Sequence, residues 1–163
     1  MCKANIKNKG ISIIEMVIAI VVVGLAIPPL ARNWFDVTTR SIRSERSADA
    51  AFYGQELMEE IRTKRFDEEI NPPWTTAAQF GAKRPDENDE TTRAKFDDVD
   101  DFAGYNDTLN GYRRWVAVNY ANITASTWQS AAAETDFKRV AVSVTRNGTA
   151  ATNITLTTVF ERY

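Results

Sequence analysis

Hydrophobic and polar residues follow different patterns along this chain, and each pattern predicts a different element. Residues 11–31 form an apolar run of 21 residues in which Glu15 is the only charged side chain. At about 1.5 Å of rise per residue, a helix of this length reaches roughly 30 Å and can cross the hydrocarbon core of a bilayer. The run therefore predicts a membrane-spanning helix.

Three residues interrupt this apolar run. Gly24 weakens a helix, while Pro28 and Pro29 remove backbone donors and crowd the preceding turn. We therefore expect a kink or a locally melted segment between Gly24 and Pro29.

Residues 32–66 predict an amphipathic helix that continues from the apolar run. Apolar residues share one stripe at helical spacing: Ala51, Gly54, Met58 and Ile61, with Tyr53 and Leu57 beside it. Charged residues fill the other positions, so we expect the stripe to pack on a sheet. The Asn-Pro-Pro sequence at 71–73 ends the helical region.

Alternation of residue types predicts three strands further along, at residues 113–121, 137–145 and 152–160. Asn147 and Gly148 precede the third strand, and an Asn-Gly pair is typical of a type I′ hairpin turn. Trp128 lies between the first two strands, where we expect it to cover the core. A small antiparallel sheet packed on the long kinked N-terminal helix gives an α+β fold.

These elements divide the chain into four parts. Residues 1–10 are a leader with three lysines and no acid. Residues 11–31 are the transmembrane helix, 32–66 the amphipathic helix, and 67–163 an exported domain with an acidic loop (86–101) and a C-terminal antiparallel sheet. Because the lysines precede the span, the leader is expected to stay in the cytoplasm and the bulk of the chain to be exported.

Composition excludes several kinds of chemistry. The 163 residues carry a net charge of -2, one cysteine and no histidine. The chain therefore lacks the commonest general base, and Cys2 alone makes neither an internal disulfide nor a four-ligand zinc site. With 20 basic against 22 acidic residues we expect no nucleic-acid partner, and no carboxylate pair stands out as acid and base, so we expect no enzyme activity.

Acidic residues gather between positions 86 and 101: Asp86, Glu87, Asp89, Glu90, Asp97, Asp98, Asp100 and Asp101. Hard cations prefer oxygen ligands, so the last four of these residues are candidate calcium ligands. The spacing that begins at Asp86 resembles an EF-hand loop but lacks its glycine at the sixth position and its final glutamate. A solvated acidic loop with no cofactor is the preferred interpretation.

Glu15 is the feature that an ordinary membrane anchor does not explain. A charged carboxylate within a membrane helix costs on the order of 3 kcal/mol on insertion scales, so it implies a partner. An ordinary secretory signal does not fit either, because its apolar stretch is shorter and ends in a small-residue cleavage site, where this chain has Pro28 and Pro29.

Residues 9–17, KGISIIEMV, resemble the leader-cleavage junction of type IV pilins and type II secretion pseudopilins. The resemblance implies that a prepilin peptidase cuts after Gly10 and methylates the new amine of Ile11. It also makes Glu15 the family's hallmark carboxylate, although Ile11 and Ser12 replace the usual phenylalanine and threonine. The new amine would be positive near neutral pH, so the Glu15 carboxylate of a neighbouring subunit would pair with it in the filament core.

A second resemblance covers residues 96–105, FDDVDDFAGY, and residues 55–61, QELMEEI. These segments are similar to the D-type minor prepilin of the mannose-sensitive haemagglutinin (MSHA) type. The resemblance implies a type IV pilin-like fold and a minor pilin that enters, or primes assembly of, a bacterial surface filament used in adhesion or motility. Its partners would be other pilin subunits through the N-terminal helix, the prepilin peptidase and the assembly platform of the inner membrane.

The implied location is a single-pass position in the bacterial inner membrane, followed by a cell-surface pilus or a periplasmic pseudopilus. Two other interpretations stay open. A type II secretion minor pseudopilin would share the junction and drive protein export. A membrane-anchored binding module would recognise a ligand or cation through the exported domain and its acidic loop.

Overall fold

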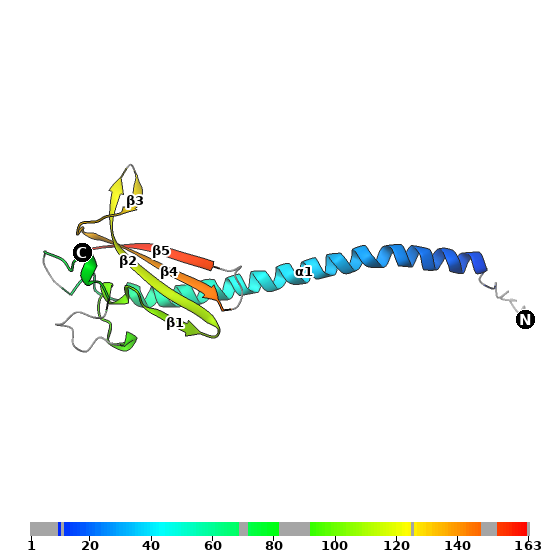
Figure 1. Ribbon diagram of the computed structural model, residues 1–163, viewed down its shortest axis with the longest axis horizontal. Helices are drawn as coiled ribbons and strands as arrows, with labels where there is room; N and C mark the ends of the chain where they lie inside the picture. The colour runs from blue at the N-terminus through cyan, green and yellow to red at the C-terminus, as the bar shows by residue number, and fades with distance from the viewer. Residues whose placement is uncertain are drawn as a thin grey trace, which may run out of the picture. The chain divides into compact units, whose positions relative to one another are not determined.

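The computed structural model describes residues 10, 12–68, 72–81, 92–124, 126–147 and 153–162. Its elements are one long helix, three short 3-10 helices and five strands (Figure 1): α1 (Ile13–Arg62), η1 (Ala77–Gln79), η2 (Arg93–Lys95), η3 (Asp100–Phe102), β1 (Asn106–Leu109), β2 (Tyr112–Thr124), β3 (Thr127–Ser130), β4 (Phe137–Arg146) and β5 (Asn153–Glu161). By its contacts the chain forms two units, Met1–Arg43 and Ser44–Tyr163. The predicted α+β class, a long apolar helix followed by a small antiparallel sheet, is confirmed.

The part of α1 in the first unit is continuous through both prolines. We predicted a kink or a locally melted segment between Gly24 and Pro29; the helix is not melted there in this single chain, and the kink stays a prediction. The physical reason is that the fixed φ of proline is compatible with a helix, so Pro28 and Pro29 delete hydrogen bonds without forcing the backbone to unwind. Melting of this segment within a filament stays a prediction.

In the second unit the strands form a sheet in the order β1-β2-β4-β5, all antiparallel, and β3 pairs with β2. The three predicted strands correspond to β2, β4 and β5, with boundaries that differ by at most a few residues. The sequence analysis missed β1 and β3. β1 is joined to β2 by Asn110 and Gly111, both with positive φ (51° and 82°), as a type I′ turn requires.

The predicted turn at Asn147 and Gly148 lies partly outside the described residues. The strands on either side of this turn, β4 and β5, do pair, but the register places Thr145 opposite Asn153, with seven residues between them. The connection is therefore longer than a two-residue hairpin turn.

The core forms where the second half of α1 packs on the sheet. Its buried helix residues are Ala50, Gly54, Leu57, Met58 and Ile61, which confirms the predicted stripe apart from Ala51 and Tyr53, which are only half-buried. Alternate residues of β2 and β4, among them Val116, Val140 and Val142, face this stripe. The helix ends at Arg62, a few residues earlier than predicted.

Trp128 does not cover this core. It lies on β3, where all four residues are exposed, and its ring packs edge-on against Phe137 at 5.1 Å. The prediction of a core cover was wrong because β2 and β3 form a hairpin of their own beyond the helix-covered part of the sheet (Figure 1).

Helix and sheet approach each other closely at Gly54. A Cβ atom at this position would lie 3.0 Å from Leu156 Cδ1 and 3.2 Å from Val144 Cγ2.

We predict that Gly54→Leu lowers the free energy of unfolding by about 1 to 3 kcal/mol through overpacking, measured by thermal melting in detergent. The matched control is Gly24→Leu in the same helix, where a Cβ has nothing within 4 Å and the melting temperature should not change. Equal effects of the two variants would contradict this account.

Candidate functional site

The first unit presents an apolar helix that is exposed on every side. Large apolar residues from Ile13 to Leu30 are all more than half exposed, and α1 is long and apolar enough to cross a membrane. A helix that is apolar all round needs a membrane or other helices around it, because a soluble helix buries only one stripe. The predicted span at residues 11–31 thus has the surface that a spanning segment requires.

Glu15 lies in the first turn of α1, within this apolar surface. Its backbone N–H donates to the Ser12 carbonyl at 3.0 Å, and a carboxylate near a helix N-terminus is favoured by the helix dipole. Its side chain is exposed and has no hydrogen-bond or ion-pair partner among the residues that the structure describes. A partner for this charge would therefore come from outside this part of the chain.

Gly10 lies before the helix, exposed, with no heavy atom within 4 Å of where its Cβ would be. Ile11, the predicted new N-terminus, lies outside the described residues.

Two aromatic residues that the sequence analysis did not single out follow the apolar run. Trp34 and Phe35 are 73% and 70% exposed on α1, directly after Arg32. Tryptophan is enriched where a spanning helix leaves the hydrocarbon core, because its ring is apolar and its N–H is polar. The spacing of Trp34 from the apolar run is the signal that would have identified it.

In the structure the four predicted calcium ligands have hydrogen-bond or ion-pair partners within the protein. Asp97 forms an ion pair with Arg65, and Asp100 accepts a hydrogen bond from Lys138 Nζ at 2.5 Å. Asp101 Oδ2 accepts the backbone N–H groups of Asp97 and Asp98, at 2.9 and 3.2 Å. Protein donors thus satisfy carboxylates that were expected to face solvent or a cation.

One group of carboxylates does lie close enough to share a cation. Oxygens of Glu68, Asp97 and Asp98 lie within 4.8 Å of one another. Arg65 already pairs with two members of this group, at 3.2 Å from Glu68 and with Asp97. Calcium binding stays a prediction, and the acidic residues 86–90 lie outside the described residues.

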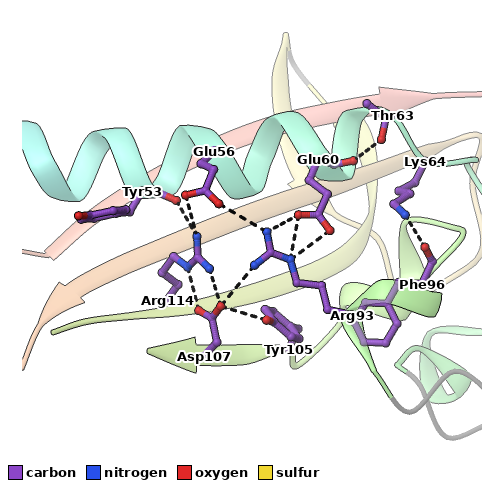
Figure 2. Close-up of polar contacts among 10 residues, drawn as sticks. All are labelled: Tyr53, Glu56, Glu60, Thr63, Lys64, Arg93, Phe96, Tyr105, Asp107 and Arg114. Carbon is purple, nitrogen blue, oxygen red and sulfur yellow. Dashed lines mark hydrogen bonds and ion pairs between the residues drawn. The ribbon is translucent and has the colours of Figure 1, made fainter. Parts of the chain in front are cut away.

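Two arginines tie α1 to the sheet and to the segment before η3 (Figure 2). Arg93 Nε donates to both carboxylate oxygens of Glu60, at 3.0 and 2.8 Å. Arg114, which is 1% exposed, makes a two-pronged contact with Asp107, whose oxygens also accept the Tyr105 hydroxyl at 3.0 Å. Burial raises the pKa of Asp107, but the Arg114 and Tyr105 donors outweigh it and hold that pKa below its ordinary value.

A second set of charges is fully buried beside the end of α1. Lys138, at the start of β4, donates from Nζ to Asp67 Oδ2 at 2.7 Å, to Asp100 and to the Phe66 carbonyl at 2.7 Å. The neighbouring Asp98 is also buried, and burial, together with the charges of Asp100 and Asp101, raises its pKa to about 9. Asp98 is therefore a neutral acid at pH 7.

A hollow of about 710 Å³ lies near the end of α1. It is lined on one side by Arg62 and Arg65 and on the other by Trp74 and Arg162, whose guanidinium lies 4.5 Å from the Trp74 ring centre. Arg62 and Arg65 are already paired with carboxylates, which reduces the positive charge offered to a ligand.

No protein-family model, curated protein or solved structure matches this chain. The pilin family therefore stays a proposal.

We predict that Asp98→Asn stabilises the folded chain above acidic pH. Asp98 has a pKa of about 9 in the folded state, above its value in the unfolded chain. Its contribution to the free energy of unfolding is therefore present at low pH and is lost as the pH rises toward 9, by up to about 1.4 kcal/mol per pH unit. Asparagine does not ionise and still accepts the Asp101 N–H. The gain in melting temperature over wild type should therefore grow from about pH 5 to about pH 8.

The control for this experiment is Asp97→Asn, which removes the half-exposed carboxylate next to Asp98 in the sequence. Its effect on melting temperature should not grow with pH in this way. Parallel curves for the two variants would show that burial at Asp98 is not the cause.

Proposed function

We propose that this chain is a minor type IV pilin of the MSHA-like kind, a structural subunit of a bacterial surface filament. The observation that carries the proposal is Glu15, a single carboxylate without a partner among the described residues, on an all-round apolar helix that begins just after an exposed Gly10. The spacing between Gly10 and Glu15 is that of the prepilin junction.

Electrostatics supports an assembly role for this residue. An unpaired charge on an apolar helix is costly in lipid or in a bundle of helices. Cleavage after Gly10 creates an α-amine with an ordinary pKa near 8, so it is mostly protonated at pH 7. The Glu15 carboxylate of an adjacent subunit supplies the opposite charge, and each group compensates the other in the low dielectric of the filament core.

The same helix fits a subunit that is stored in the inner membrane before assembly. The apolar surface ends near Ala31, and Arg32 and Trp34 follow it at the level where polar headgroups begin. The prepilin peptidase acts on the cytoplasmic side of this span, and the assembly platform passes the processed helix into contact with the helices of other pilin subunits.

We predict that Gly10→Leu blocks processing, because a prepilin peptidase requires a small residue before the bond that it cuts. In cells that contain this peptidase, the variant should keep its full 163 residues, as measured by mass spectrometry of the membrane-extracted chain. Gly24→Leu, the same change within the span, should still be shortened. A normally shortened Gly10→Leu product would refute the pilin proposal and favour a membrane-anchored binding module.

We predict that Glu15→Val leaves membrane insertion and cleavage intact but reduces incorporation into filaments by about tenfold or more. The physical reason is that the amine of Ile11 loses its partner in a buried site, and about 1.4 kcal/mol corresponds to each factor of ten. Immunoblots of sheared filaments against membranes measure the ratio. Asp36→Val, which removes the next acid along α1, should assemble as wild type does, and unchanged incorporation of Glu15→Val would remove the proposed pairing.

A further inference from the structure

Lys138 occupies a site that is unusual for a lysine. Its side chain is 0% exposed, and its Nζ lies 2.5 Å from Asp100 Oδ1 and 2.7 Å from Asp67 Oδ2. The two carboxylate side chains are 1% (Asp67) and 4% (Asp100) exposed. An amine and two carboxyl groups are thus held in contact where little water reaches them.

Aromatic rings form the walls of this site. The Nζ atom lies 4.5 Å from the ring centre of Phe66, 5.3 Å from Phe80 and 5.7 Å from Tyr120. The Tyr120 hydroxyl points away to the Thr75 carbonyl, to which it donates at 2.6 Å. The rings stabilise the ammonium through their π faces and at the same time exclude water.

The two carboxyl groups are not equivalent. Asp67 accepts two further hydrogen bonds, from the Thr75 hydroxyl at 2.9 Å and from the Thr75 backbone N–H at 3.3 Å. These donors hold its carboxylate in place 2.7 Å from the Lys138 Nζ. Asp100 lies closer to Nζ, at 2.5 Å, so it is the acid placed to react, and Asp67 is placed to relay a proton.

We propose that Lys138 and Asp100 condense into an isopeptide bond within this site, with Asp67 as the proton-transfer group. A proton first passes from the Lys138 ammonium to the Asp100 carboxylate, which leaves a neutral amine beside a carboxylic acid. The Nζ lone pair forms the new N–Cγ bond, Asp67 takes a proton from this nitrogen and passes it to the departing hydroxyl, and the Cγ–O bond breaks. One ammonium and one carboxylate thus give one amide and one water, and Asp67 ends as it began.

Two physical effects favour this reaction here over the same reaction in solution. Fixed contact between the amine and the acid replaces a bimolecular encounter, which is worth an effective concentration of about 10⁵ M or more in well-oriented intramolecular reactions. Condensation also replaces a buried ion pair by a neutral amide, whose remaining N–H can still donate to the Phe66 carbonyl.

The bond would join β4 to η3, two segments 38 residues apart in sequence. The sole cysteine is Cys2, so no intrachain disulfide can hold the exported domain together. This inference concerns only the second unit and holds whether or not the chain enters a filament.

Peptide mapping of the full chain tests the proposal. The chain is extracted from membranes, digested with trypsin and analysed by mass spectrometry. We expect residues 96–113 joined to residues 115–139, with a combined mass lower by one water and no cleavage after Lys138. Separate unmodified peptides, with cleavage after Lys138, would overturn the proposal, and a link from Lys138 to residues 66–83 would overturn the choice of Asp100.

Variants test the roles of the two acids. Asp67→Asn should fold, as judged by circular dichroism, but lose the cross-linked peptide, and Asp100→Ala should lose it as well. The matched control is Asp97→Asn, a change at a half-exposed acid whose carboxylate pairs with Arg65 rather than with Lys138, and it should keep the cross-link. A cross-link that persists in Asp67→Asn would overturn the proton-transfer role.

Discussion

The second unit depends on one constraint, the close packing of the charge-bearing helix α1 against the sheet. Gly54 lets α1 approach so closely that a Cβ atom at this position would crowd the side chains of Leu156 and Val144. This close approach also brings the charged residues that flank the apolar stripe of α1 next to the sheet. Arg114 pairs with Asp107, and Arg93 pairs with Glu60. These ion pairs compensate the charges that the packing takes out of water.

Much of this arrangement could be predicted from residue patterns. The apolar stripe of α1 and the alternation of β2, β4 and β5 were recognised because packing against one face imposes a fixed period on the sequence. β1 was missed although Asn110 and Gly111 carry a strong turn signal, because the strand before them, Asn106–Leu109, is short and polar. A four-residue strand has too little alternation to be recognised.

The alternation of inward-facing and outward-facing residues along the strands also contained information about the buried charges. Arg114 lies on the same face of β2 as Tyr112 and Val116, and Lys138 on the same face of β4 as Val140, so alternation alone would place both side chains inward. What the sequence could not supply is the identity of their partners, since Asp67 and Asp100 come from distant, irregular segments. The same limit applies to the acidic loop. Its many carboxylates suggested calcium, but in the fold Arg65 pairs with Asp97 and Lys138 pairs with Asp100.

The contact between Gly54 and Leu156 also has a consequence for the order of events during synthesis. Leu156 belongs to β5, whereas Gly54 leaves the ribosome about a hundred residues earlier, so the helix stripe is covered only when the far end of the chain arrives. Until then the apolar stripe on the second half of α1 stays uncovered. A chain that stops before β5 would thus keep an exposed apolar stripe, the kind of surface that chaperones and proteases recognise, and would be removed.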